Sequence, residues 1–237
     1  MLLSLALGAA LSATVALACT AREAEAAFTQ KIVFTSDRTT GTGVNNPTGD
    51  NEIFRMNPNG TGVRQLTFNE VFDSRPLLSP DGTKILYHSQ DAQPSNPEGD
   101  QEIYIMNASD GSGQKNLTDN RAVLYEGHAQ FSPDGQKIAY FSEGAQEGNL
   151  EGEREIYIMN ASDGSGQKNL TNNGEGLWEQ GPRFSPDGQK ILYTSYGVQA
   201  SNPEGDHELY VMNAADGAAK KNLTNNNARD FDAEWGR

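Results

Sequence analysis

Acidic side chains recur at one position along this sequence and could together bind a cation. An acid stands at corresponding places in four successive stretches, with a two-residue shift in the last: Asp73, Glu126, Glu179 and Asp230. An aromatic residue precedes the acid in the first three stretches and an arginine in the fourth: Phe72, Tyr125, Trp178 and Arg229. Carboxylate oxygens suit a hard cation such as Ca²⁺, and carboxylates placed together need a compensating charge. Two interpretations stay open: these eight residues bind a ligand, with the acids holding Ca²⁺ or a basic group, or each acid accepts hydrogen bonds from its own loop.

A second set of acids recurs just before a run of apolar residues: Asp50, Asp100, Glu153 and Asp206. Three of them end the pattern Asn-Pro-x-Gly-Asp, which is typical of a tight turn. This set is interpreted as structural.

Catalytic motifs are missing from the sequence. The three histidines are His88, His128 and His207, and no two of them share a position relative to the recurring stretches. The sequence has no Gly-x-Ser-x-Gly, His-Glu-x-x-His or phosphate-binding Gly-x-x-x-x-Gly-Lys pattern. An enzyme remains an alternative if the residues that differ between copies, namely Trp178, Tyr125, Arg229 and His128, converge in one pocket.

An internal repeat of 53 residues must position these side chains. Residues 102–118 are identical to residues 155–171, and variants of the same segment occupy 52–67 and 208–224. Two further landmarks agree on the period. The lysines that open a short apolar run are 53 residues apart: Lys31, Lys84, Lys137 and Lys190. The Ser-Pro-Asp-Gly turns, which begin at 79, 132 and 185, have the same spacing.

Each repeat predicts four short antiparallel strands joined by a Ser-Pro-Asp-Gly turn, a long loop and an Asp-Gly hairpin. Continuous apolar runs such as 103–106 indicate sheets covered on both faces, as in stacked propeller blades. The predicted fold is therefore an all-β, four-bladed β-propeller. The segment Asp232–Gly236 matches the first strand of a repeat, so it is predicted to close the first blade.

The combined motif resembles the propeller repeat of the TolB family, which is also found in the propeller domain of prolyl oligopeptidases. It reads Pro-x-Phe-Ser-Pro-Asp-Gly-Gln-Lys-Ile-x-Tyr, then Glu-Ile-Tyr-Ile-Met-Asn, Asp-Gly and Asn-Leu-Thr, and the resemblance covers residues 28–237. It implies a β-propeller of the bacterial envelope that acts in protein interactions. TolB proteins have six blades behind another domain, whereas four repeats occur here, so a role in the Tol-Pal system does not follow.

The sequence also predicts how the chain is processed. Residues 1–26 are interpreted as a signal peptide and 27–237 as the propeller, with repeat units near 28–73, 74–126, 127–179 and 180–237. One alternative is processing before Cys19, the single cysteine, which would then carry a lipid. Another is that the apolar segment is never cleaved and stays as a membrane anchor. The signal peptide and the lipidated form both predict a secreted or periplasmic protein.

The charge balance restricts the partners. With 32 acidic and 18 basic residues the net charge is −14, which repels phosphate backbones and excludes nucleic acid as a partner. The sequence favours a monomeric, non-enzymatic module that binds a protein or small ligand with its variable long loops. A lyase or hydrolase at the mouth of the channel and a purely structural surface protein are the alternatives.

Overall fold

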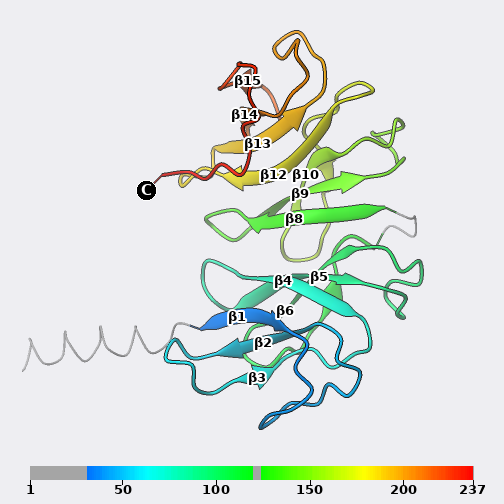
Figure 1. Cartoon of the computed structure of the whole chain (residues 1–237), viewed down its shortest axis with the longest axis vertical. Helices are drawn as coiled ribbons and strands as arrows, with labels where there is room; N and C mark the ends of the chain where they lie inside the picture. The colour runs from blue at the N-terminus through cyan, green and yellow to red at the C-terminus, as the bar shows by residue number, and fades with distance from the viewer. Residues whose placement is uncertain (1–30, 120–123, 237) are drawn as a thin grey trace, which may run out of the picture.

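The computed structural model describes residues 31–119 and 124–236, and its regular elements there are all β-strands (Figure 1). They form four antiparallel sheets in chain order, which we call blades 1 to 4. Blade 1 contains β1 (Ile32–Ser36), β2 (Glu52–Met56) and β3 (Arg64–Gln65), which correspond to the second, third and fourth strands of the other blades. Blade 2 contains β4 (Phe72–Leu78), β5 (Lys84–Gln90), β6 (Glu102–Asn107) and β7 (Lys115–Asn116). Blade 3 contains β8 (Tyr125–Phe131), β9 (Lys137–Glu143), β10 (Glu155–Asn160) and β11 (Lys168–Asn169). Blade 4 contains β12 (Trp178–Phe184), β13 (Lys190–Tyr196), β14 (Glu208–Asn213) and β15 (Lys221–Asn222). The predicted all-β fold with four blades is confirmed.

The turns form where the sequence predicts them. In blade 3 the Ser132 hydroxyl donates to Asp134 over 2.5 Å and accepts the amide N–H of Lys137 over 2.9 Å, which closes the turn between β8 and β9. The Asp-Gly hairpin between β10 and β11 needs its glycine for two reasons. Gly164 has a φ of 77°, and a Cβ there would lie 2.2 Å from the carbonyl oxygen of Leu117 in blade 2.

The core lies between the blades and not within one central cluster. Ile53, Tyr87 and Met106 belong to a buried cluster between blades 1 and 2. Equivalent clusters fill the next two interfaces, with Tyr140 between blades 2 and 3 and Tyr193 between blades 3 and 4. Both faces of the middle blades are therefore covered, as the continuous apolar runs predict.

The blades stack in sequence. Strand β4 packs on β1 and β2, β8 on β5 and β6, and β12 on β8, β9 and β10. Blades 1 and 4 lie at opposite ends of this stack in Figure 1. The strands β4, β8 and β12 each carry a β-bulge near their middle.

The predicted closure of blade 1 by the C-terminal segment is not confirmed. Blade 1 has three strands among the described residues, and residues 229–236 form no strand. The segment instead runs beside β12, where the Trp235 indole N–H donates to the carbonyl oxygen of Arg183 over 3.1 Å. It follows blade 4 and packs beside the innermost strand of that blade, and it does not pair with β1.

The predicted signal peptide (1–26) and Cys19 lie outside the described residues. Within the described part of the chain, no helix is long and apolar enough to cross a membrane.

Candidate functional site

The predicted acids lie on the end of the propeller that carries the long loops. These loops, residues 91–101, 143–154 and 197–207, join the second and third strands of blades 2 to 4. Strands β4, β8 and β12 begin at the same end, which we call the long-loop face. The opposite end, which we call the hairpin face, carries the Ser-Pro-Asp-Gly turns and the Asp-Gly hairpins.

The four predicted acids occupy equivalent places in the backbone. Each amide N–H donates to a carbonyl oxygen of the preceding blade, at the residue just before its third strand. The bonds are Asp73 to Asn51 (2.8 Å), Glu126 to Gln101 (3.1 Å), Glu179 to Arg154 (2.8 Å) and Asp230 to His207 (2.7 Å). The two-residue shift assigned to Asp230 therefore matches the observed geometry. Asp73, Glu126 and Glu179 are buried, and Asp230 is half-buried.

The structure brings Asp73, Glu126 and Glu179 beside a glutamate of the preceding blade, and Asp230 shares Asn226 with the equivalent glutamate. That glutamate opens the third strand in every copy and is almost fully buried: Glu52, Glu102, Glu155 and Glu208. The members of the second acidic set stand two residues before these glutamates. Asp100, Glu102 and Glu126 offer oxygens that lie within 4.8 Å of one another, and no other trio of His, Cys, Asp or Glu in the described residues does so. The four predicted acids thus do not gather at this spacing.

The glutamates of the third strands are not among the predicted site residues. The signal was present, because a charged residue opens four otherwise apolar strands. A buried carboxylate needs hydrogen-bond donors, and a threonine of the fourth-strand segment supplies one: the Thr118, Thr171 and Thr224 hydroxyls donate to Glu102, Glu155 and Glu208.

Side chains also hold the predicted acids. The Asn69 amide donates to Asp73 over 3.0 Å, and the Asn173 amide donates to Glu179 over 2.8 Å. The Ser142 hydroxyl donates to Glu126 over 3.0 Å. These bonds favour a structural contribution, with side-chain donors instead of the loop backbone.

Burial raises the pKa of these carboxyl groups. The pKa of Glu52 and that of Glu102 are each raised to about 7 by burial, with further upward contributions from neighbouring acids. The pKa of Glu126 is raised well above its ordinary value by burial and by Glu102. Each interface must therefore be compensated by protons or by a cation.

One interface carries its own cation. The Lys220 ammonium group donates to the Thr171 carbonyl oxygen and lies 3.1 Å from the Asn173 side-chain oxygen, next to Glu155 and Glu179. In the preceding copy Gln167 stands at this position, and it donates to the Leu117 carbonyl oxygen over 3.2 Å. The Asp100, Glu102 and Glu126 cluster has no lysine of this kind. Of the interfaces, this cluster has the donor set best suited to Ca²⁺.

Aromatic side chains lie beside the acids on the long-loop face, and we call them the aromatic band: Phe72, Tyr125, Trp178, Tyr196 and His207. Phe72 and Tyr125 are exposed by 44% and 43%, so their rings are open to a ligand. Trp178 stacks on Tyr196 at 6.1 Å, and Tyr196 stacks on His207 at 4.7 Å. The last predicted residue, Arg229, is exposed and has no hydrogen bond or ion pair among the described residues.

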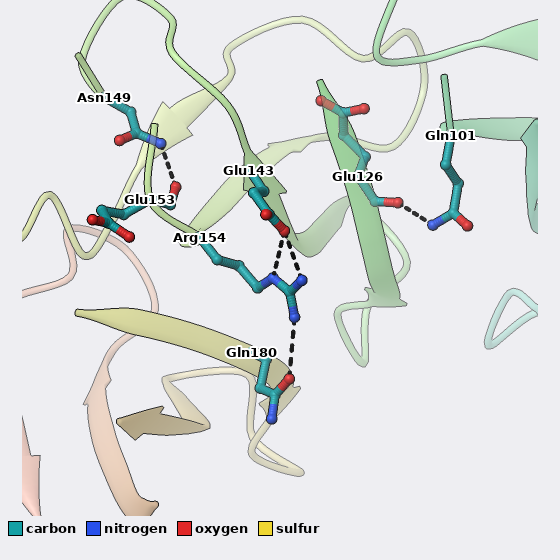
Figure 2. A network of polar contacts seen from close by, with 7 residues as sticks. All are labelled: Gln101, Glu126, Glu143, Asn149, Glu153, Arg154 and Gln180. Carbon is teal, nitrogen blue, oxygen red and sulfur yellow. Dashed lines mark hydrogen bonds and ion pairs between the residues drawn. The ribbon is translucent and has the colours of Figure 1, made fainter. Parts of the chain in front are cut away.

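Arg154 fixes blade 3 against blade 4 in this band (Figure 2). Its guanidinium contacts Glu143 at 2.6 Å and Gln180 at 3.3 Å, and it lies over the rings of Phe141 (4.3 Å) and Trp178 (5.5 Å). Figure 2 also shows the Gln101 amide donating to the carbonyl oxygen of Glu126, which ties blade 2 to blade 3. Hydrogen bonds and ring contacts therefore link neighbouring blades at this band.

The residues that differ between copies do not converge. His128 lines a hollow at the middle of the innermost strands together with Arg75 and Arg183, whereas Trp178, Tyr125 and Arg229 do not line it. The convergence that would favour an enzyme at the channel mouth is not observed.

No protein-family model matches the chain. Among solved structures, a putative TolB from Agrobacterium tumefaciens is 23% identical with a TM-score of 0.56, and the match covers 73% of this chain and 56% of that chain. TolB from Acinetobacter baumannii is 22% identical with the same TM-score of 0.56, covering 83% of this chain and 42% of that chain. The chain folds as a TolB-like β-propeller.

This TolB-like propeller matches only about half the length of those solved structures. An oligogalacturonate lyase from Vibrio parahaemolyticus has the same fold, with 17% identity, a TM-score of 0.53, and coverage of 73% of this chain and 42% of that chain. The TolB-like fold therefore does not by itself decide between binding and catalysis.

Proposed function

We propose that this TolB-like propeller is a non-enzymatic binding module of the cell envelope or the secreted fraction. Its long-loop face binds a cationic segment of a partner protein. The buried acids set the geometry of this face, and the aromatic band and the exposed loop acids contact the partner.

The excess of exposed acids on the long-loop face carries this proposal. Seven of the eight lysines stand at the hairpin face, because they open the second and fourth strands: Lys31, Lys84, Lys115, Lys137, Lys168, Lys190 and Lys221. On the hairpin face these lysines stand among exposed turn aspartates: Asp81, Asp110, Asp134, Asp163, Asp187 and Asp216. Exposed acids occupy the loops of the opposite face: Glu70, Asp91, Asp119, Glu147, Glu151, Glu175 and Glu204. The long-loop face is therefore strongly negative, which attracts a cationic partner and accelerates its encounter.

The aromatic band adds a second recognition element. A lysine or arginine of the partner can lie on the exposed ring of Phe72 or Tyr125 while its charge points to the neighbouring loop acids. On the same face, Arg38 already lies 5.0 Å and 4.9 Å from the centroids of Phe34 and Phe54. The proposal extends to the partner a contact that the propeller makes within itself.

Site-specific crosslinking tests which face binds. A photo-crosslinking residue replaces Leu150 or Val198, which are 80% and 74% exposed in the long loops. The matched control carries it at Ser112, on the hairpin face. We expect the two loop positions to capture a common partner from a cell-envelope extract and Ser112 to capture none. Capture at Ser112 alone would place the interaction on the hairpin face and contradict the proposal.

A titration tests the charge of the partner. A fluorescent decalysine peptide should bind, and the triple variant Glu147→Gln, Glu151→Gln and Glu204→Gln should bind it at least about tenfold more weakly at low salt. The control variant Lys115→Gln with Lys168→Gln changes the charge of the hairpin face instead and should keep the parent affinity. Equal effects of both variants would contradict recognition by the long-loop face.

A further inference from the structure

A hollow of about 490 Å³ lies at the middle of the innermost strands, below the aromatic band. Its polar walls come from different blades and include Arg75 on β4, His88 on β5, His128 on β8 and Arg183 on β12. The volume falls within the range typical of small-molecule sites. None of these four residues belongs to the predicted ligand-binding set.

The backbone at two of these residues is in an unfavourable conformation. Arg75 and His128 have φ angles of 52° and 49°, in the left-handed region that residues with a side chain rarely adopt. The equivalent residue of the next copy, 53 positions further on, is Gly181 with a φ of 63°. Glycine therefore satisfies the β-bulge at this position without strain. The bulge does not need the arginine or the histidine, and it turns their side chains toward the hollow that they line.

The lining carries two arginines and two carboxylates, and the arginine on β4 is left without an ion pair within residues 31–119 and 124–236. The Arg75 guanidinium has no hydrogen bond or ion pair among the described residues. Burial and the nearby Arg75 lower the pKa of His128 to about 4 and that of His88 to about 3, so both rings are neutral at pH 7. The buried Nδ1 atom of His128 has no hydrogen-bond partner within the described chain. Asp232 and Glu234 also line the hollow, and Glu234 is already paired.

One of the two lining carboxylates already pairs with an arginine. Glu234 of the C-terminal segment pairs with the Nε atom of Arg183 at 3.1 Å. The Glu234 side chain is 67% exposed, and such open ion pairs contribute little to stability. Its carboxylate shows how a carboxylate from solution would approach the arginine.

We propose that the hollow binds a small organic carboxylate, held by the guanidinium of Arg75 beside the ring of His128 and within reach of Arg183. The ligand would pair with the Arg75 guanidinium, which has no ion pair in the described part of the chain, and would break no hydrogen bond of β4 or β8. This site is separate from the proposed long-loop interface, because none of the residues that line the hollow belongs to the long loops or to the aromatic band.

The thermal stability of the full chain in sodium malonate tests the proposal, with sodium chloride at equal ionic strength as reference. We expect a saturable rise in Tm of roughly 5 °C at saturating malonate. Inorganic phosphate should give a clearly smaller rise, and an equal rise would mean a general anion site and overturn the assignment to a carboxylate.

Two variants separate binding from folding. Arg75→Gly with His128→Gly should raise Tm without ligand, because the strain is relieved, and should abolish the saturable shift. Asn172→Gly is the matched control, since Asn172 also has a positive φ (41°) but does not line the hollow, and it should keep the shift. A double variant that malonate stabilises as much as the parent, or a parent without a saturable shift, would overturn the proposal.

Discussion

The buried acids between neighbouring blades link the stability of the fold to pH. Glu52 and Glu102 have ordinary pKa values of 4.5, which burial raises to about 7. Between these values the folded chain holds protons that the unfolded chain has released, so protonation favours folding. This contribution to stability is complete below pH 4.5 and is lost as the pH rises through about 7.

We therefore expect the free energy of unfolding to fall between pH 5 and pH 8.5, and Glu102→Gln to make that fall smaller. Glutamine resembles the protonated acid but does not titrate, and the lost contribution is roughly 1–3 kcal/mol. Urea unfolding at several pH values measures it. Glu147→Gln removes an exposed acid and should keep the parent profile. A Glu102→Gln profile identical to the parent would contradict the raised pKa.

The Asp100, Glu102 and Glu126 cluster allows the calcium prediction to be tested at single residues. If these acids bind Ca²⁺, excess Ca²⁺ should raise Tm relative to chelator by a few degrees, and Glu126→Gln should abolish that rise. Glu179→Gln should leave it intact, because Lys220 already compensates the acids of that interface. No shift in the parent would leave the acids with their hydrogen-bonding role alone.

At the scale of single elements, the Asp-Gly hairpins determine how closely the blades approach. Gly164 and Gly148 have similar φ angles of 77° and 81°, but only Gly164 lies against the carbonyl oxygen of Leu117. A Cβ at Gly148 would meet no atom within 4 Å. The pair separates the effect of backbone conformation from that of contact between blades.

Gly148→Ala should destabilise the protein by about 1 kcal/mol, because only the backbone conformation is penalised. Gly164→Ala should lose about 2–4 kcal/mol, because blades 2 and 3 must also move apart. Chemical denaturation of both variants measures the difference. Equal losses of stability in the two variants would mean that the contact between the hairpin and the preceding blade does not limit their packing.

Local patterns in the sequence predict the elements well. The 53-residue period predicts four equivalent sheets, and Ser-Pro-Asp-Gly and Asp-Gly predict their turns, because these motifs act through backbone geometry within a few residues. Contacts between repeats, in contrast, join residues that are far apart in the sequence. The pairing of Glu102 with Glu126 and the hollow at Arg75 and His128 depend on how blades pack and where the strands bulge, which periodicity does not specify.

At the scale of the whole molecule, the end of the chain is the least predictable part. The match of Asp232–Gly236 to a first strand correctly places the segment after blade 4, but the segment forms no strand and does not pair with β1. In the structure the Trp235 indole N–H and the Glu234 carboxylate both contact Arg183 of blade 4. Sequence similarity between strands cannot show whether the two ends of the stack meet.

Removal of residues 232–237 distinguishes the two arrangements. If the segment only packs on blade 4, the truncated protein should lose about 1–2 kcal/mol of stability and sediment as the parent does. If the segment closes blade 1 in solution, truncation should expose the edge of β1 and promote association. Sedimentation velocity at several concentrations separates the outcomes.

Because the blade interfaces are equivalent, a gene for such a protein can gain or lose whole blades. Two adjacent repeats share an identical 17-residue segment, and each repeat meets its neighbour through the same buried tyrosine, the same glutamate and the same hairpin glycine. Unequal recombination between the corresponding DNA segments would add or remove one whole blade in register. Every product would contain only interfaces of a kind that already folds, so blade number can vary while the architecture is inherited unchanged.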